Sequence, residues 1–351
     1  MLTLTELSRQ AGANGGAELD ETVWAQIETL RQGRTQNDKP FFDLEIVDAD
    51  GRAKFKIWSD SSAFDQCHDL QAGDFCELSG RFFVNNFGLN VSRPTLRTLA
   101  DDEVEIFLQG SPAVAKLNQD NWDYMVSVFT TLQEPRLREV SLAALKSLEK
   151  KWRRAAAART YHHARRGGLL EHTSQMLRLA VAVAPLYPEV CPDLLYCGVL
   201  FHDAGKMWEN NYPKRGFVSK PNRRGELLGH ISLGIEITNK YWNQTKEANS
   251  ELFANTAESE LVRDHLLHLI AAHHGTREFG SPVTPRTPEA WLLHHIDNID
   301  AKMEMLRRVY VEKDEVAPGL YDRRPPLEGL TAAPLSWNLP ADGDTAVKMA
   351  A

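Results

Sequence analysis

The stretch that most constrains the fold is an apolar run that ends in two polar side chains. Residues 194–201 read Leu-Leu-Tyr-Cys-Gly-Val-Leu-Phe, which is the hydrophobicity of a buried helix, and His202 and Asp203 follow directly. An unpaired charge in a core is expensive. Imidazole and carboxylate both bind metals, so a bound cation is the usual remedy. A His-Asp pair alone also fits a core histidine that is hydrogen-bonded to its neighbour.

Other histidines and aspartates lie beside apolar helical sequence, so each of them should point inward. They are His172, His230, His273, His274, Asp297 and Asp300. Several such groups on different helices are hard to satisfy by hydrogen bonds alone, and a half-satisfied polar core is costly. A metal centre built from facing helices would satisfy them together.

The N-terminal part, residues 21–100, has the pattern of a β module. Alternating segments 41–47 and 53–58 flank Asp50-Gly51, which predicts a hairpin. We expect further strands over 23–30, 74–84 and 89–96, and a short helix over 61–70. Three strands, a helix and two strands is the order of a five-stranded OB-type β-barrel. A small β-sandwich is the main alternative.

An OB face binds single strands by aromatic stacking beside basic side chains. The candidates are Phe41, Phe55, Trp58, Phe82, Phe83 and Phe87, with Arg52, Lys54, Lys56, Arg81 and Arg93 nearby. Most aromatic residues in a small barrel are simply core. Nucleic-acid binding by this module and a purely structural role therefore both stay open.

The remainder of the chain reads as helical. Residues 1–20 are expected to form a flexible leader, 101–118 a linker, 119–311 an all-α bundle and 312–351 a Pro-rich irregular tail. The expected helices are 121–132, 135–158, 168–184, 192–201, 226–242, 258–272 and 288–311. The fold class is thus a multidomain α+β protein, a β-barrel followed by a helical bundle.

Charge and composition exclude some classes of protein. A net charge of -8 argues against a protein that coats duplex DNA, although a local groove could still bind nucleic acid. The 4 cysteines lack CxxC spacing, which favours a reducing cytoplasm. No apolar stretch approaches the roughly 18 residues of a membrane span, and the N-terminus does not read as a secretory signal.

The order of His172, His202-Asp203 and a distal aspartate resembles the HD phosphohydrolase superfamily. His230 and His273-His274 look like its dinuclear branch. Further blocks resemble the YhaM-type 3′→5′ exoribonucleases, which also carry an OB module before the HD domain. These blocks are residues 162–164, 167–172, 202–206, 225–230, 273–275, 278–282 and 297–303.

The resemblance implies two divalent ions and a ligand for each position. The first ion would be held by His172, His202, Asp203 and Asp297, and the second by Asp203 as a bridge, His230 and His273. His274 is either a ligand or a contact to phosphate. Asp300 is the rival of Asp297, which we prefer because it aligns with the family's aspartate. Such a pair suits two-metal hydrolysis, with Mn expected and Fe, Co or Ni as alternatives.

Basic residues near the ligands are candidate substrate contacts. Lys206 should lie one turn after Asp203 on the same helix and reach a phosphate, unless it is a solvated helix-end lysine. Upstream of the first ligand, a basic segment could line an RNA path or be a solvated helix end. A second basic stretch should form a loop that covers the site. The first set is His162, His163, Arg165 and Arg166, and the second is Lys214, Arg215, Arg223 and Arg224.

The function implied is a 3′→5′ exoribonuclease that degrades single-stranded RNA to nucleoside 5′-monophosphates. Asp203, Lys206 and His274 are its candidate catalytic residues. We expect a cytoplasmic homo-oligomer, with single-stranded DNA as a possible second substrate. One alternative is a phosphohydrolase of small nucleotides with a regulatory OB domain. Another is a single-strand DNA-binding protein associated with replication.

Overall fold

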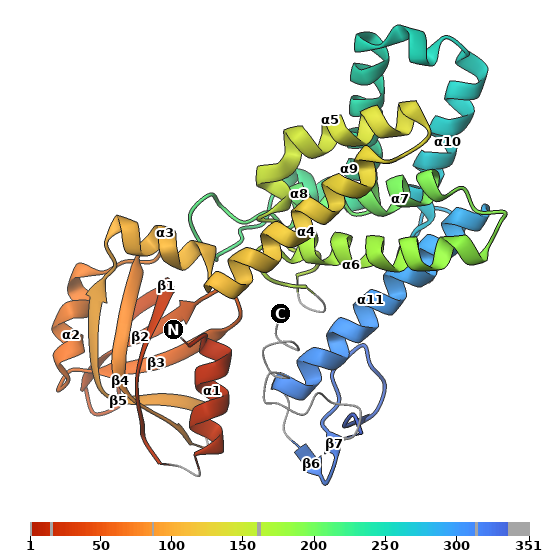
Figure 1. Cartoon of the computed structure of the whole chain (residues 1–351). Coiled ribbons are helices and arrows are strands. Elements are labelled where there is room, and N and C mark those ends of the chain that lie inside the picture. The colour runs from red at the N-terminus through yellow and green to blue at the C-terminus, as the bar shows by residue number, and fades with distance from the viewer. Residues whose placement is uncertain (1, 15–16, 86–87, 160–162, 313–314, 336–351) are drawn as a thin grey trace. The chain divides into compact units, whose positions relative to one another are not determined.

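The chain divides into two compact units. The structure is a computed structural model that describes residues 2–14, 17–85, 88–159, 163–312 and 315–335. Unit 1 comprises Met1–Ala115 and Tyr212–Ser219, and unit 2 comprises Lys116–Asn211 and Lys220–Ala351. Figure 1 shows the strands of unit 1 in red to orange and the helices of unit 2 in yellow to blue.

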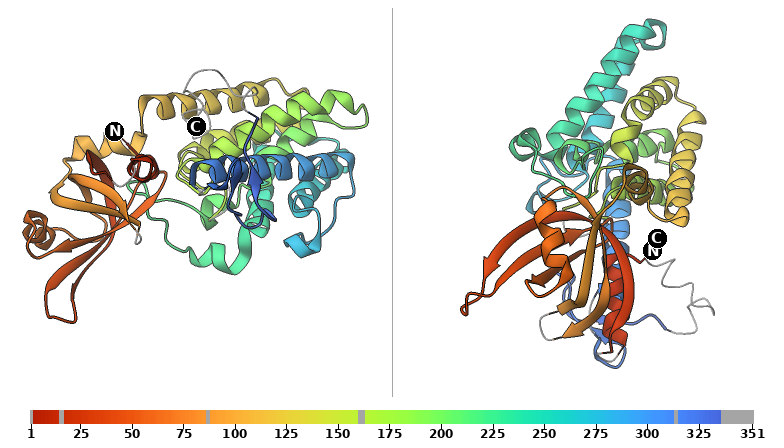
Figure 2. Two further views of the ribbon diagram at one scale, coloured as in Figure 1. Left: turned by 90° about the horizontal axis from the view of Figure 1, so that it is seen from below. Right: turned by 90° about the vertical axis from the view of Figure 1, so that its left-hand side faces the viewer.

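Unit 1 is built on a five-stranded antiparallel sheet of order β3-β2-β1-β4-β5 (Figures 1 and 2). The strands are β1 (Leu19–Arg34), β2 (Pro40–Val47), β3 (Arg52–Trp58), β4 (Phe75–Asn85) and β5 (Gly88–Thr98). The predicted hairpin joins β2 to β3, with Val47 opposite Arg52. The short helices α2 (Ser62–Gln66) and η1 (Cys67–Asp69) follow. The edge strands β3 and β5 approach each other, but no ladder between described residues joins them. Closure into an OB barrel therefore stays a prediction.

The prediction of a flexible leader over residues 1–20 was wrong. Residues Leu4–Ala13 form α1, whose N-terminus is a capping box: the Thr3 hydroxyl accepts from the Glu6 N–H, and the Glu6 carboxylate accepts from the Thr3 N–H. Leu4 and Leu7 are fully buried in the core of unit 1, together with Ile27 and other apolar residues of the sheet. Burial of these side chains holds the helix in place.

The expected linker, residues 101–118, is also helical. It forms α3 (Asp101–Gln109) and the start of α4 (Pro112–Thr130), with Gly110 between them at a φ of 76°. The acidic first turn of α3 suits a helix N-terminus, which the linker prediction overlooked.

The segment 212–219 leaves unit 2 and belongs to unit 1. The Phe217 ring is 2% exposed and packs with Val104 and Phe75. Its N–H donates to Gln26 Oε1 at 2.7 Å. In the sequence, this segment lies between two parts of unit 2. The polypeptide therefore crosses between the units more than once.

Unit 2 is a helical bundle around α7. Its helices are α4, α5 (Pro135–Trp152), α6 (Gly168–Val183), α7 (Pro192–Phe201), α8 (Lys206–Glu209), α9 (Arg223–Ala248), α10 (Thr256–Ala272) and α11 (Pro288–Glu312). Helix α7 begins with Pro192 at its first turn and buries Leu195, Val199 and Phe201, as its apolar sequence predicts. Helices α6, α10 and α11 pack against it. Helix α5 ends at Trp152, before the predicted 158.

The tail is partly ordered. Strands β6 (Glu315–Ala317), β7 (Leu320–Tyr321) and β8 (Thr331–Ala332) form a small antiparallel sheet, where an irregular tail was predicted. Residues 336–351 lie outside the described residues. None of the helices in the described chain has both the length and the apolar character needed to cross a membrane.

Candidate metal centre

One group of side chains joins α6, the end of α7 and α11. His172 Nε2 lies 3.3 Å from His202 Nε2 and 3.5 Å from Asp297 Oδ1. Asp203 Oδ2 lies 3.4 Å from His202 Nε2 and 3.7 Å from His172 Nε2. His172 and His202 are fully buried. These atoms face one another across the space that a metal ion with imidazole and carboxylate ligands would occupy.

Asp300 lies behind this group. Its Oδ2 accepts from His172 Nδ1 at 2.7 Å, on the ring nitrogen opposite the one that faces Asp297. The pair Asp297 and Asp300 is therefore divided by role, one carboxylate at the ligand side and one at the back of the same imidazole. A carboxylate in that position fixes the tautomer and the ring orientation of a metal-binding histidine.

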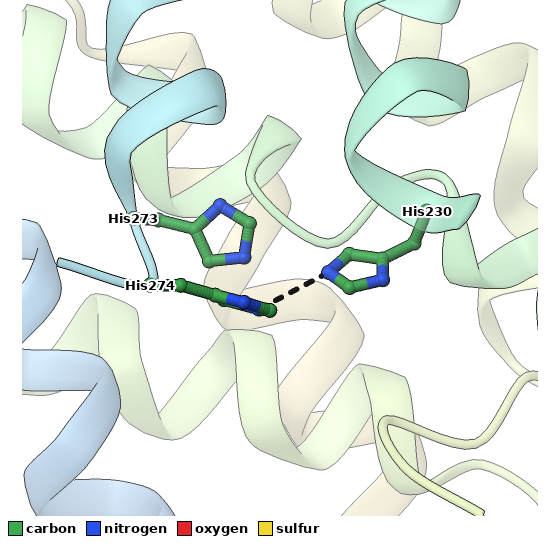
Figure 3. Close-up of side chains that lie close together, drawn as sticks. All are labelled: His230, His273 and His274. Carbon is green, nitrogen blue, oxygen red and sulfur yellow. Dashed lines mark hydrogen bonds between the residues drawn. The ribbon is translucent and has the colours of Figure 1, made fainter. Parts of the chain in front are cut away.

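A second group joins α9 to the end of α10. Figure 3 shows the rings of His230, His273 and His274 turned toward one another, with His230 Nε2 and His274 Nε2 3.2 Å apart. Asp203 Oδ1 lies 3.5 Å from His230 Nε2 and 3.7 Å from His273 Nε2. The two oxygens of Asp203 thus face different groups of imidazoles, as a bridging ligand would.

Glycine makes the approach of α9 to Asp203 possible. A Cβ atom on Gly205 would lie 1.9 Å from the carbonyl oxygen of His230, so no other residue fits without moving the backbone. Gly229, just before His230, has a φ of 67° and marks a kink in α9. The two glycines bring the start of α9 against the turn that carries Asp203.

The second ring nitrogen of each imidazole is occupied, and this pattern tests the fit of a metal. Nδ1 contacts an oxygen acceptor in every case: Asp300 for His172, the Val199 carbonyl for His202, Glu209 for His230, the Ile270 carbonyl for His273 and the Phe279 carbonyl for His274. A carbonyl can only accept, so Nδ1 carries the proton and Nε2 presents a lone pair. His273 Nε2 is buried without a hydrogen-bond partner. Converging lone pairs of this kind fit divalent metal ions. Without a bound ion, these buried acceptor atoms would be unsatisfied.

The surroundings of Asp203 and His273 favour the forms in which these two side chains bind metals. Burial raises the pKa of Asp203, but the Lys206 ammonium and the imidazoles around it outweigh burial and hold that pKa well below its usual range. Burial and the neighbouring His274 and His202 hold the pKa of His273 well below the usual value. The carboxylate is therefore ionised and His273 is neutral, which are the protonation states of metal ligands.

Lys206 lies at the centre, although not on the predicted helix. Helix α7 ends at Phe201, and Lys206 begins α8 after a turn. The turn between them brings Gly205 close to the backbone of His230. Lys206 Nζ still reaches Asp203 Oδ2 at 2.9 Å, and its side chain is 11% exposed. It is an ammonium beside the candidate ligands rather than a solvated lysine.

The upstream basic segment is not an open phosphate-binding surface. His163 is fully buried, with Nε2 donating to Asp300 Oδ2 at 3.0 Å. Arg165 pairs with Glu171 at 2.5 Å and with Glu304 at 2.8 Å. The predicted substrate contacts His163 and Arg165 lie behind the candidate metal centre, where they contact acidic side chains of α6 and α11. Arg166 is half-buried. His162 lies outside the described residues.

The second basic stretch is divided between the units. Lys214 and Arg215 are exposed and belong to unit 1, where Arg215 pairs with Asp101 at 2.8 Å. Arg223 and Arg224 lie in the first turn of α9, not in a loop. Arg224 pairs with Glu236. The stretch was read as one loop because only its charge was visible in the sequence.

Sequence reasoning missed the supporting carboxylates. Glu209 contacts His230 Nδ1 at 3.0 Å, and Glu171 and Glu304 hold Arg165 behind Asp300. Glu171 stands next to His172, but its contact is with residues before the helix. Only Glu209, three residues after Lys206, carried a signal: an acidic residue close to a metal-binding motif often orients a ligand.

Comparison with known proteins agrees with this geometry. The family model "HD domain" matches residues 169–302, from α6 into α11. A relative from Bacillus pumilus (strain SAFR-032), the 3′-5′ exoribonuclease YhaM, is 31% identical over 306 residues, which covers 85% of this chain and 89% of the relative. The 3′-5′ exoribonuclease YhaM of Bacillus subtilis (strain 168) is 30% identical over 317 residues, 88% of this chain and 92% of the relative.

The resemblance inferred from the motif blocks is thereby confirmed, over a length that includes both units. The HD pair named in the motif is His202-Asp203, at the centre of the two groups of ligands. The chain belongs to the YhaM family of HD-domain enzymes, and it is a hydrolase.

Proposed function

We propose that this hydrolase is a metal-dependent 3′→5′ exoribonuclease that degrades single-stranded RNA to nucleoside 5′-monophosphates. The observation that carries the proposal is the arrangement of imidazole Nε2 atoms around the two oxygens of Asp203. The names of the relatives, both 3′-5′ exoribonucleases, support the direction of degradation and the choice of RNA.

Two divalent ions fit the centre, one on each side of Asp203. His172, His202 and Asp297 would hold the first, and His230, His273 and His274 the second. Imidazole-rich ligation suits Mn, Fe, Co or Ni better than Mg. We propose Mn for the assay. Divalent ions bound in such a pair supply Lewis acidity, which makes water a nucleophile at neutral pH and polarises a phosphate.

The side chains around the ligands would orient and stabilise the phosphodiester. Lys206 Nζ, now held by Asp203, is placed to neutralise charge that develops on a phosphate oxygen. His274 is the more exposed member of the α10 pair, so it is suited to contact a phosphate from the solvent side. Asp300 and Glu209 would keep their imidazoles oriented through the reaction.

Unit 1 would hold the strand whose 3′ end is hydrolysed. Lys214, Arg215, Arg223 and Arg224 remain candidates for phosphate contacts, since all four are exposed. Arg215 would have to exchange its carboxylate partners for phosphate. A cytoplasmic location, a homo-oligomeric state and hydrolysis of single-stranded DNA stay predictions.

The direct test is digestion of labelled single strands with Mn added. We expect a ladder of shortened products from 5′-labelled RNA and immediate release of a labelled mononucleotide from 3′-labelled RNA. DNA of the same sequence should be hydrolysed more slowly. Internal cleavage of either strand would reject the exonuclease proposal.

The matched control is a pair of aspartate variants. Asp203→Ala should abolish hydrolysis, while Asp264→Ala, an exposed aspartate of α10, should leave it unchanged. If purified Asp203→Ala hydrolyses RNA as fast as the wild type does, catalysis belongs to another site or to a contaminant.

A further inference from the structure

A hollow on unit 1 lies where the end of β3 meets β5, away from the metal ligands in sequence. Its lining includes Lys56, Trp58, Asp60, Ser61, Arg93 and Pro94. All of these residues belong to unit 1, so the hollow is complete within that unit.

Trp58 forms an accessible aromatic surface in this hollow. Its side chain is 37% exposed, whereas Phe55 and Phe82, two other aromatic candidates from the sequence, are core residues with at most 1% exposure. The Trp58 ring packs against the Phe41 ring, with ring centroids 5.5 Å apart. Packing against Phe41 fixes the indole in place, so little conformational entropy remains to be lost when a ligand stacks on it.

Two ammonium groups already lie over the rings. Lys56 Nζ is 4.8 Å from the Phe41 centroid and 5.9 Å from the Trp58 centroid, and Lys39 Nζ is 5.4 Å from the Trp58 centroid. Asp60, a carboxylate in the lining of the hollow, pairs with Lys39 at 2.9 Å. Unit 1 therefore brings ammonium groups to an aromatic surface, although the whole chain is acidic.

Arg93 is presented to the hollow by a strained bulge. Its φ is 51°, a conformation that non-glycine residues seldom adopt, and the β4–β5 register shifts beside it. Gly80 makes the bulge possible, because a Cβ there would lie 2.6 Å from Val91 Cγ2 and 3.0 Å from the Ser92 carbonyl. No carboxylate among the described residues pairs with Arg93. Backbone strain of this kind is concentrated at binding sites.

We propose that this hollow binds one nucleotide of a single-stranded nucleic acid, with its base stacked on Trp58 and a phosphate held by Lys56 and Arg93. Stacking accepts any base and requires the base to be unpaired, which excludes a duplex. The cations above the ring would move from the aromatic face to the phosphate. The inference rests on the proposed nuclease function for its ligand, and it names a contact that the metal centre does not make.

The test measures binding of a fluorescent 12-nucleotide RNA to the full chain in an Asp203→Ala background, where hydrolysis is prevented. Trp58→Ala should weaken binding about tenfold, which is about 1.4 kcal/mol. Trp58→Phe should restore binding to within about threefold, because it keeps an aromatic surface. Trp291→Ala, which removes an exposed tryptophan of α11, is the matched control and should bind like its parent.

Arg93→Gly separates charge from structure. Glycine accepts the positive φ, so the variant should be at least as stable as wild type while losing the guanidinium. The slope of log Kd against log salt should fall by about 0.7, the value for one phosphate contact on a single strand. Arg93→Lys should keep that slope.

Two results would overturn the proposal: Trp58→Ala that binds RNA within about twofold of its parent, or Arg93→Gly with an unchanged salt slope. The same substitutions are also made in the active enzyme, with Asp203 intact, and dinucleotide hydrolysis is measured. This measurement distinguishes a failure of the hollow proposal from a failure of the proposed nuclease function. If wild type hydrolyses RNA but the hollow variants bind normally, only the hollow is rejected. If wild type hydrolyses no RNA, the proposed function is rejected, and the binding data still show whether the hollow binds RNA.

Discussion

The two sides of Asp203 differ in the burial of the imidazole that contacts a carboxylate and in the burial of that carboxylate. His172 and His202 on the first side are fully buried, and a buried carboxylate, Asp300, accepts from His172. On the second side His230 is 15% exposed, and Glu209, the carboxylate that contacts it, is 22% exposed. The other imidazoles on both sides contact backbone carbonyls.

This difference suggests distinct roles for the two sides. A buried carboxylate is screened less than a more exposed one, so it orients its imidazole more firmly, and burial slows exchange with solvent. We expect the first side to hold its ion more tightly and the second side to face the substrate. The following predictions test that comparison, beginning with the largest effect.

Removal of the shared carboxylate should affect both sides at once. Asp203→Ala should lower kcat by about 10³-fold or more, since several kcal/mol of transition-state stabilisation depend on the metals. Steady-state hydrolysis of RNA with Mn measures this. A loss below about tenfold would show that Asp203 does not bridge the two sides.

Two glycine substitutions should disturb one side each. Gly205→Ala places a Cβ against the His230 carbonyl, and Gly168→Ala places one 2.0 Å from the His163 carbonyl, behind His172. Each should cost about 3 kcal/mol of unfolding free energy, because backbone atoms cannot yield as a side chain can. Ion binding to the variants by calorimetry should show a weakened second site for Gly205→Ala and a weakened first site for Gly168→Ala. The same pattern in both variants would contradict separate sides.

Alkaline pH should loosen the first side. Burial lowers the pKa of His163, but the Glu171 and Asp300 carboxylates outweigh it and raise that pKa to about 9. A raised histidine pKa stabilises the fold fully below pH 6.5, and this stabilisation is lost as the pH rises toward 9. Unfolding free energy should fall by at most about 3 kcal/mol across this window. Denaturant titrations at several pH values should show that the unfolding free energy of His163→Gln depends less on pH than that of the wild type. The same pH dependence in both proteins would refute the assignment of this effect to His163.

Removal of the supporting carboxylates should have smaller effects. Asp300→Asn should weaken Mn binding at the first side by about 10- to 100-fold, the usual cost of losing such a partner. Glu209→Gln should cost less at the second side, because Glu209 is more exposed and its interaction with His230 is screened. Mn titrations of the two variants provide the measurement, and an equal or reversed order would break the comparison.

Much of the centre could be predicted because metal ligation demands particular residue types at the ends of apolar helices. That pattern singled out His172, His202, Asp203, His230 and His273, and the structure brings their side chains together. Their role as ligands stays a prediction. The different positions of Asp297 and Asp300 depend on tertiary packing. The two residues are three positions apart on one helix and point in different directions, and the sequence does not show which of them faces His172 from which side. The contacts of the basic residues could not be predicted for the same reason: Arg165 and Arg215 are as charged as any phosphate contact, and only the fold shows which carboxylates they meet.

The β module shows the same limit. The hairpin around Asp50-Gly51 follows from local turn chemistry and was correct. Whether Trp58 or Phe55 faces solvent depends on strand register and on the neighbouring strands, which period-two alternation alone does not decide. The leader became α1 because Leu4 and Leu7 find a core to enter, a contact far away in sequence.

Counting the bound ions tests the central claim most directly. Native mass spectrometry of Mn-loaded protein should find two ions per chain in wild type, one in the His230→Ala/His273→Ala double variant, and no tightly bound pair in Asp203→Ala. One ion in wild type, or two retained by the double variant, would contradict a centre in which Asp203 joins two groups of imidazoles.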